Sequence, residues 1–211
     1  MKTVIQKLIS ILLSVFFLFS IAGCKDESNS SDLAQKDNYK LYLNETFNSV
    51  EDLSDCQGYQ NWYYYCGDPE IDTLSYLTYN GYYGRWCSKF HTLYYSTYIW
   101  GTSWLPDGVQ GYGIGMGFKA PATGKLNIFV ELQLVMPAEI SNSDGIVFTI
   151  SDRRGDPYDG LTLGKEDGGK EFIIDATIDV KMGEEVLFML YANSNNTHDC
   201  TDVNITINYV E

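Results

Sequence analysis

The sequence predicts an all-β fold, a single antiparallel β-sandwich. Apolar and polar residues alternate along several stretches, which is the period of a strand with one buried face. Clusters of Gly, Asp, Asn and Pro separate these stretches, and convincing helical periodicity is absent from the folded part. Short strands at this spacing are typical of a β-sandwich.

The second half of the chain carries the clearest strands. In residues 125–136 every second residue from Leu126 to Met136 is apolar, which predicts one buried face. The further strands predicted here cover residues 146–150, 172–180, 186–191 and 203–209. Turn-forming residues lie between them, at residues 142–145, 155–157, 167–169 and 182–184.

Residues 59–112 hold all four Trp and twelve of the seventeen Tyr. Their Tyr, Thr and Ile content predicts strands at residues 61–66, 74–79, 89–100 and 111–119, with a tight hairpin turn at Asn80–Gly81. Glycine occupies every second place in residues 111–117, so one face of that strand carries no side chain. We expect another backbone or a large ring to pack closely there.

The N-terminus predicts a targeting segment. Lys2 and Lys7 give a basic start, and residues 8–21 form an apolar run of the length of a signal-peptide core, too short for a spanning helix. Residues 21–24, Ile-Ala-Gly-Cys, resemble a bacterial lipobox, in which lipid is attached to the cysteine. We therefore expect a lipoprotein signal peptide at residues 1–23 and lipidation of Cys24, with a plain secretory signal as the alternative.

Residues 24–38 are expected to form the lipidated start and a flexible tether, because they hold too few apolar side chains to fold. Residues 24–27, Cys-Lys-Asp-Glu, look like the export tag of Bacteroidetes surface lipoproteins, although a solvated linker would look similar. The expected location is the outer membrane, with a lipid anchor and with the domain at residues 39–211 facing the cell exterior.

The chain is strongly acidic. Its formal charge is −14, and this becomes −16 once residues 1–23 and their two Lys are removed. Such a balance opposes binding to nucleic acid or anionic lipid and suits neutral or cationic partners. We expect no nucleic-acid partner, and contact with the membrane only through the lipid on Cys24.

Four cysteines lie in the expected domain: Cys56, Cys66, Cys87 and Cys200. An even number in an exported chain predicts disulfides, with three connectivities open. The simplest pairing joins Cys56 to Cys66 and Cys87 to Cys200. A zinc site with His91 and His198 is the alternative, which the absence of a C-x-x-C spacing disfavours.

Several short motifs follow one another along the folded part. They comprise Asn61-Trp62-Tyr63-Tyr64, Trp100-Gly101, Trp104-x-Pro106-Asp107, Ala120-Pro121-x-x-Gly124, Asp144-Gly145-Ile146, Gly183-Glu184-x-Val186-x-Phe188 and Asp199-x-Thr201. This order resembles the jelly-roll accessory modules of bacterial secreted glycan-active proteins. The chain departs from that pattern at Met116–Gly117, where a Val-Arg is usual, and after Thr201. The resemblance implies a jelly-roll fold and an association with carbohydrate.

Exposed Trp and Tyr rings would let the chain bind sugar, since a pyranose packs its flat C–H face on an aromatic ring. The expected ligand-binding residues are Asn61, Trp62, Tyr64, Trp86, Trp100, Trp104 and Asp107. About half of the aromatic rings are expected in the core. The expected function is non-catalytic binding of a polysaccharide or glycoconjugate, and a protein-binding or structural surface lipoprotein is the alternative.

Residues 193–202 are dense in oxygen donors, which predicts a candidate structural calcium site at Asn195, Asp199 and Asp202. Asn-rich turns also bond their own backbone, and no cofactor is required. An enzyme is not expected, because no nucleophile elbow, HExxH or paired-Cys redox motif occurs. The alternative is acid–base chemistry by His91 with Tyr94, Tyr95 or Arg85.

Overall fold

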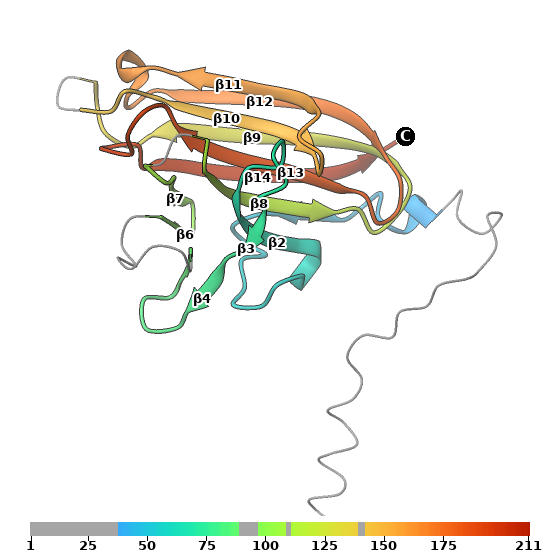
Figure 1. The fold of residues 1–211 in the computed structure, drawn as a ribbon. Coiled ribbons are helices and arrows are strands. Elements are labelled where there is room, and N and C mark those ends of the chain that lie inside the picture. Colours follow the sequence, from blue (N-terminus) through green and yellow to red (C-terminus); the bar gives the residue numbers. More distant parts are fainter. Residues whose placement is uncertain (1–37, 89–96, 109–110, 139–141) are drawn as a thin grey trace, which may run out of the picture. The chain divides into compact units, whose positions relative to one another are not determined.

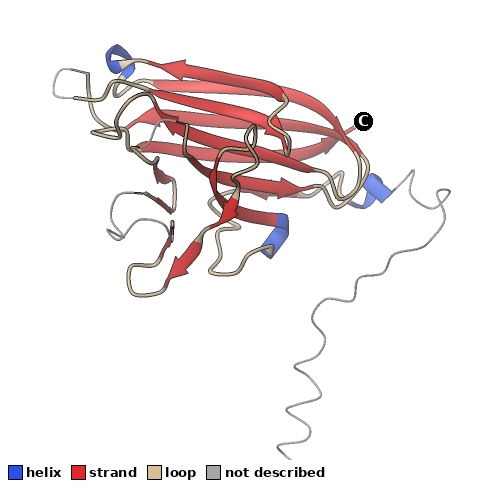
Figure 2. Ribbon diagram, in the orientation of Figure 1, coloured by secondary structure: helices blue, strands red, loops and turns tan. Residues whose placement is uncertain are grey.

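A computed structural model describes residues 38–88, 97–108, 111–138 and 142–211. Within these ranges the regular elements are strands and three short 3-10 helices, η1 (Asn38–Leu41), η2 (Tyr59–Asn61) and η3 (Lys165–Asp167). They belong to one compact unit, Gln35–Glu211 (Figures 1 and 2). The all-β prediction is confirmed. None of the described helices is long and apolar enough to cross a membrane.

Two antiparallel sheets make up the fold. The eight-stranded sheet has the order β12-β9-β14-β7-β6-β5-β4, and β1 also pairs with β14. Its strands are β1 (Thr46–Asn48), β4 (Thr78–Asn80), β5 (Arg85–Cys87), β6 (Tyr98–Trp100), β7 (Ser103–Leu105), β9 (Gly124–Leu134), β12 (Glu171–Val180) and β14 (Thr201–Val210). The six-stranded sheet has the order β11-β10-β13-β8-β2-β3. Its strands are β2 (Trp62–Gly67), β3 (Ser75–Tyr76), β8 (Gly113–Lys119), β10 (Ile146–Asp152), β11 (Pro157–Leu163) and β13 (Glu185–Ala192). The chain passes from one sheet to the other at each of the steps β8 to β9, β9 to β10, β11 to β12, β12 to β13 and β13 to β14, as in a jelly-roll sandwich.

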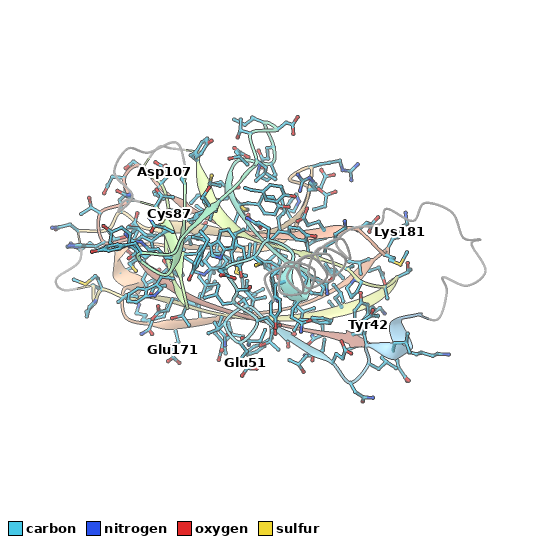
Figure 3. The ribbon with its side chains drawn as sticks, turned by 90° about the horizontal axis from the view of Figure 1, so that it is seen from below. Tyr42, Glu51, Cys87, Asp107, Glu171 and Lys181 are labelled. Atoms are coloured by element: carbon cyan, nitrogen blue, oxygen red, sulfur yellow. The ribbon has the colours of Figure 1, made fainter. Side chains whose placement is uncertain are left out.

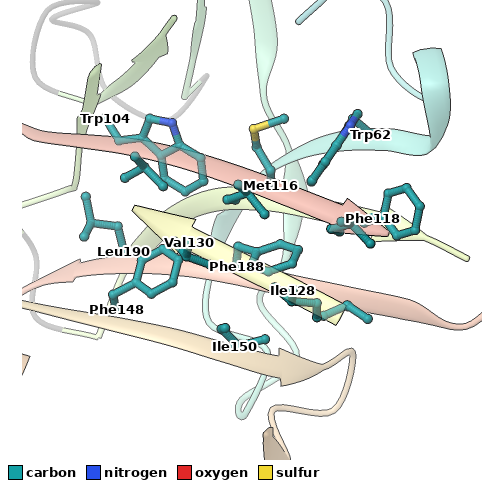
Figure 4. Close-up of a cluster of buried hydrophobic side chains, with 14 of the residues drawn as sticks. Trp62, Trp104, Met116, Phe118, Ile128, Val130, Phe148, Ile150, Phe188 and Leu190 are labelled. Atoms are coloured by element: carbon teal, nitrogen blue, oxygen red, sulfur yellow. The ribbon is translucent and has the colours of Figure 1, made fainter. Parts of the chain in front are cut away.

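The core lies between the two sheets and is built by the predicted alternation. Every second side chain of β9, from Leu126 to Leu134, is buried, and so are the alternate residues of β14 from Val203 to Tyr209. Figure 4 shows Ile128 and Val130 beside Phe148, Ile150, Phe188 and Leu190 of the other sheet. Met136 lies beyond the end of β9 and is half-buried.

The strands predicted in the aromatic stretch, residues 59–112, are confirmed where the structure describes them, with shifted boundaries. The stretch predicted at residues 74–79 is divided into β3 and β4, because Leu77 turns inward and its N–H donates to the carbonyl of Tyr64. The hairpin at Asn80 has a four-residue loop, closed by the Asn80 side chain, which accepts hydrogen bonds from the N–H groups of Tyr82 and Tyr83. Of the strand predicted at 89–100, residues 89–96 lie outside the described part, and the remainder contains β6.

Four strands are absent from the sequence-based expectation: β1, β5, β7 and β11. Three of them are only three residues long, too short for a periodic signal. β11 has seven residues, but it contains Pro157 and an Asp-Gly pair that are typical of turns. It lies at the edge of its sheet, where a strand can begin with proline and face solvent.

The glycine-rich strand β8 packs as predicted. A Cβ on Gly113 would lie 2.7 Å from the ring of Tyr191, and one on Gly117 would lie 2.8 Å from the ring of Tyr65. A Cβ on Gly115 would lie 2.0 Å from the carbonyl oxygen of Phe188. The bare face of β8 is therefore filled by side chains and backbone of its neighbours.

The predicted disulfides are wrong, since none of the four cysteines of the domain forms a disulfide. Cys66 points into the core, with its Sγ 3.3 Å from Oγ of Ser75, whereas Cys56 is exposed. Cys87 lies on β5, where its backbone is opposite Tyr98 of β6. Strands β6 and β7 lie between β5 and β14, and Cys200 directly precedes β14. At about 4.8 Å per strand the two cysteines of this pair are about 14 Å apart, too far for a disulfide.

Candidate functional site

Four of the predicted ligand-binding rings lie in the core, so the expectation that they face a ligand is wrong. Trp62, Tyr64 and Trp104 are fully buried, and Trp86 is 3% exposed. Each occupies an inward position of its strand, as Figure 4 shows for Trp62 and Trp104. Tyr64 stacks on Trp86, with ring centroids 4.2 Å apart and an angle of 12° between the ring planes. This contact connects the two sheets, because Tyr64 lies on β2 and Trp86 on β5.

The other three predicted ligand-binding residues differ in exposure. Trp100 is 60% exposed on β6, Asp107 is buried, and Asn61 is half-buried in the left-handed backbone region with a φ of 69°. Figure 3 shows Asp107 and Cys87 towards one end of the domain, opposite Lys181. In the turn from Trp100 to Asp107 the Trp100 ring is therefore exposed, whereas Trp104 and Asp107 are buried.

The three predicted calcium ligands are directed to different partners. Asn195 accepts a hydrogen bond from the N–H of Thr197, and Asp202 accepts from the hydroxyls of Thr102 and Ser103. Asp199 is fully buried and accepts from the hydroxyl of Ser143. Within the described ranges no group of three or more His, Cys, Asp or Glu side chains could hold a metal ion. The amide oxygen of Asn195 is not among these side-chain types, so calcium binding at Asn195, Asp199 and Asp202 stays a prediction from sequence.

Asp199 should make the protein more stable in mild acid. Burial raises the pKa of Asp199 to about 6, and the negative charge of Asp144 adds to this effect. The folded state therefore takes up a proton between pH 7 and 5 that the unfolded state takes up only near pH 4, so stability falls as pH rises through 6. The expected loss from pH 5 to pH 8 is about 1–1.5 kcal/mol, because at pH 5 only about one unit of the difference between the folded pKa and the pH is used. Thermal unfolding across this range should show it, and Asp199→Asn should flatten the profile. If stability instead rises from pH 5 to pH 8, and Asp199→Asn removes that rise, the raised pKa of Asp199 is contradicted.

A hollow of about 720 Å³ lies on the outer face of the six-stranded sheet, at the end where β2 begins and β10 ends. We call it the tyrosine groove. Its lining residues are Tyr63, Tyr65, Tyr76, Lys119, Asp152, Arg153, Arg154, Tyr158, Lys181, Gly183, Glu184 and Glu185. The volume is within the usual range for small-ligand sites.

The alternation of β2 builds one wall of the groove. Because Trp62, Tyr64 and Cys66 point inward, Tyr63 and Tyr65 point outward. Tyr76 of β3 pairs directly with Tyr65, and their rings stack with centroids 5.0 Å apart.

A hydrogen-bonded network fixes the floor of the groove. The hydroxyl of Tyr65 donates to Oε1 of Glu185 at 2.6 Å, and Nη1 of Arg153 donates to Oη of Tyr65 at 3.0 Å and to Oε2 of Glu185 at 2.5 Å. Burial and the bond to Glu185 raise the pKa of Tyr65, so it remains a donor at neutral pH. The guanidinium of Arg153 also lies over the Tyr65 ring, 5.4 Å from its centroid. The network therefore holds Arg153 in place.

Three further rings are available to a ligand. Tyr76 is 52% exposed and Tyr158 of β11 is 42% exposed. Tyr63 is half-buried, with its centroid 6.2 Å from that of Tyr76. The groove thus offers open aromatic faces beside charged side chains.

The sequence analysis expected Trp62 and Tyr64 of β2 to face a ligand, whereas Tyr63 and Tyr65 are the residues that point outward. In residues 62–66 the inward and outward sets are both aromatic, so hydrophobicity does not tell them apart. Tyr158 and Arg153 were missed because β11 and its hairpin were not predicted. A signal was available in the pair Arg153–Arg154, since the chain has 14 Lys and Arg against 28 Asp and Glu.

No family model and no curated protein matches the chain. Among solved structures, it is similar to the C-terminal CBM6 of LamC, a marine laminarinase from Zobellia galactanivorans, with 17% identity and a TM-score of 0.30 over 50% of this chain and 76% of that one. It is similar to a family 35 carbohydrate binding module from Clostridium thermocellum, with 16% identity and a TM-score of 0.29 over 51% and 92%. It is also similar to the xylan-binding module CBM15, with 11% identity and a TM-score of 0.38 over 79% and 97%. Other matched chains include glycoside hydrolases, of which this chain covers between 15% and 27%. Each of these TM-scores is below 0.5, so the function of the groove is argued from its own residues.

Proposed function

We propose that the protein binds a polysaccharide or glycoconjugate in the tyrosine groove, without catalysis. The observation that carries this proposal is the set of exposed Tyr76 and Tyr158 rings, with the half-buried Tyr63 ring, around a hollow edged by charged side chains. Sugar rings pack on such aromatic faces, while ionic and polar side chains bind the hydroxyls.

The carboxylates of the groove favour binding over hydrolysis. A glycosidase needs one carboxyl group to give a proton and a second to act as base or nucleophile. Here Glu185 is held by Tyr65 and Arg153, and Asp152 is held by both Nε and Nη2 of Arg154. Ion-paired carboxylates of this kind are poor proton donors.

We further propose that the domain is displayed at the outer surface by the lipid on Cys24. This part rests on the signal peptide and tether predicted from residues 1–38. A domain held by a covalent lipid and a flexible segment can reach polymers near the membrane while staying anchored.

Removal of the open rings tests the glycan proposal. We expect Tyr76→Ala and Tyr158→Ala each to weaken binding about tenfold, equivalent to about 1.4 kcal/mol of lost stacking, with little change in thermal midpoint. Affinity electrophoresis of the detergent-solubilised full chain against plant, host and bacterial polysaccharides measures this.

Two matched controls address the other exposed aromatics. Tyr82→Ala removes a ring that is 88% exposed outside the groove, and Trp100→Ala removes the exposed ring at the site expected from sequence. Both should leave binding unchanged. Retardation that is lost only in the Trp100 variant would place the glycan at β6 and overturn the assignment to the groove.

A further inference from the structure

Positive charge is concentrated at the groove of this acidic protein. Four of the 14 Lys and Arg residues of the chain line it: Lys119, Arg153, Arg154 and Lys181. Two of them are among the three arginines of the chain. With a formal net charge of −14, the protein surface as a whole should repel anions, so a local excess of cations is informative.

The acceptor oxygens of the groove are used inside the protein. Both carboxylate oxygens of Glu185 accept hydrogen bonds, from Tyr65 and from Arg153. Oδ1 of Asp152 accepts from two backbone N–H groups and its Oδ2 accepts from Arg154. Oε2 of Glu184 accepts from the N–H of Lys181, and its Oε1 lies 3.9 Å from the Lys181 ammonium. Few acceptors are left for a ligand.

The donors of the groove, in contrast, are partly unused. Arg153 bonds to the protein through Nη1, which leaves its Nε and Nη2 groups, and its side chain is 53% exposed. Arg154 bonds through Nε and Nη2, which leaves Nη1 on a side chain that is 79% exposed. Within the described ranges Lys119 takes part in no ion pair, and its side chain is exposed. A ligand here meets cationic donors with free N–H groups.

We propose that the groove selects an anionic glycan, whose carboxylate or sulfate groups bind Lys119 and the free edges of Arg153 and Arg154. This inference rests on the proposed glycan-binding function and names the class of glycan. An arginine anchored on one edge binds an anion at low entropic cost, because its rotamer is already set. Bonds from cationic donors to anions are about twice as strong as bonds between neutral groups. The tyrosine faces hold the sugar rings while the cations select the charge.

The test compares polymers that differ in charge and share a backbone. Affinity electrophoresis of the detergent-solubilised full chain is run against polygalacturonate and its methyl-esterified form, and against dextran sulfate and dextran. We expect the charged member of at least one pair to bind about tenfold or more tightly than its neutral partner, and to weaken as NaCl rises from 50 to 500 mM. Retention of polygalacturonate alone would assign a carboxylated ligand, and retention of dextran sulfate alone a sulfated one.

A charge-matched pair of variants locates the effect. Lys119→Ala should weaken binding of the charged polymer several-fold. Lys165→Ala makes the same charge change on η3, which follows the end of β11 that pairs with the start of β10, away from the groove, and should leave binding unchanged. Lys119→Arg keeps the charge and should restore binding.

The outcomes separate the two proposals. Equal binding of charged and neutral polymers, with loss in Tyr76→Ala, would overturn the anionic-ligand inference and leave glycan binding standing. Absence of binding to every polymer, in this test and in the wider panel above, would overturn both. Equal losses in Lys119→Ala and Lys165→Ala would show a general charge effect and overturn the role of the groove cations.

Discussion

Gly115→Ala is expected to unfold the domain or to destabilise it by more than about 4 kcal/mol. Gly115 lies in the middle of β8, between β13 and β2, in the six-stranded sheet. A Cβ there would lie 2.0 Å from the carbonyl oxygen of Phe188 and 2.7 Å from Sδ of Met189. The carbonyl belongs to the paired strand, so relief requires separating β8 from β13 and opening the core beneath Met116 and Phe118. Urea unfolding followed by tryptophan fluorescence would measure the loss.

Gly81→Ala is the matched control for this change. Gly81 lies in the β4–β5 loop, and a Cβ at that position meets nothing within 4 Å. Its φ lies outside the left-handed region, so alanine is expected to change stability by no more than about 0.5 kcal/mol. Equal stability of the two variants would show that β8 and β13 separate more easily than their pairing indicates.

The strand β8 also shows why part of the fold could be predicted. Glycine at every second place predicts that another backbone or a large ring packs on one face of the strand, whatever the neighbouring sequence. The alternation of β9 and β14 is similarly explicit, because every other side chain is strongly apolar. These patterns are local, so the sandwich and much of its core follow from them.

The groove could not be predicted in the same way, because it depends on pairing between distant segments. Tyr65, Arg153 and Glu185 are up to 120 residues apart in sequence. Nothing in residues 62–66 states which aromatic set faces the other sheet. The disulfide prediction failed for a related reason, since the spacing of cysteines says nothing about the strands that separate them.

The composition of the chain and the lining of the tyrosine groove indicate partners of different charge. A formal charge of −14 predicts neutral or cationic partners. The groove, however, is lined by four cationic side chains, and the oxygens of its carboxylates accept hydrogen bonds from within the protein. Ligand recognition follows the free donors and acceptors within a few ångströms, because solvent and salt screen the remaining charge. Net charge therefore describes the surface and not the groove.

Trp62→Ala is expected to cost about 3–5 kcal/mol of folding free energy, a large fraction of the roughly 5–15 kcal/mol that stabilises a typical domain. Trp62 is fully buried, with its ring centroid 5.2 Å from that of Phe118 and 6.0 Å from that of Phe188. Removal of the indole leaves a cavity between the sheets that the two phenylalanines cannot close. Thermal unfolding of the variant measures the loss.

Trp62→Phe should be far milder than Trp62→Ala. It retains a ring in the same place, and Nε1 of Trp62 has no hydrogen-bond partner among the described residues, so no bond is lost. We expect a cost of about 1–2 kcal/mol and unchanged glycan affinity in the folded fraction. If Trp62→Phe folds normally yet loses glycan binding, the ring itself contacts the ligand, and the core position assigned to Trp62 is contradicted. The pair of variants thus separates a ring that builds the sandwich from the Tyr76 and Tyr158 rings, whose loss should weaken binding and leave the fold intact.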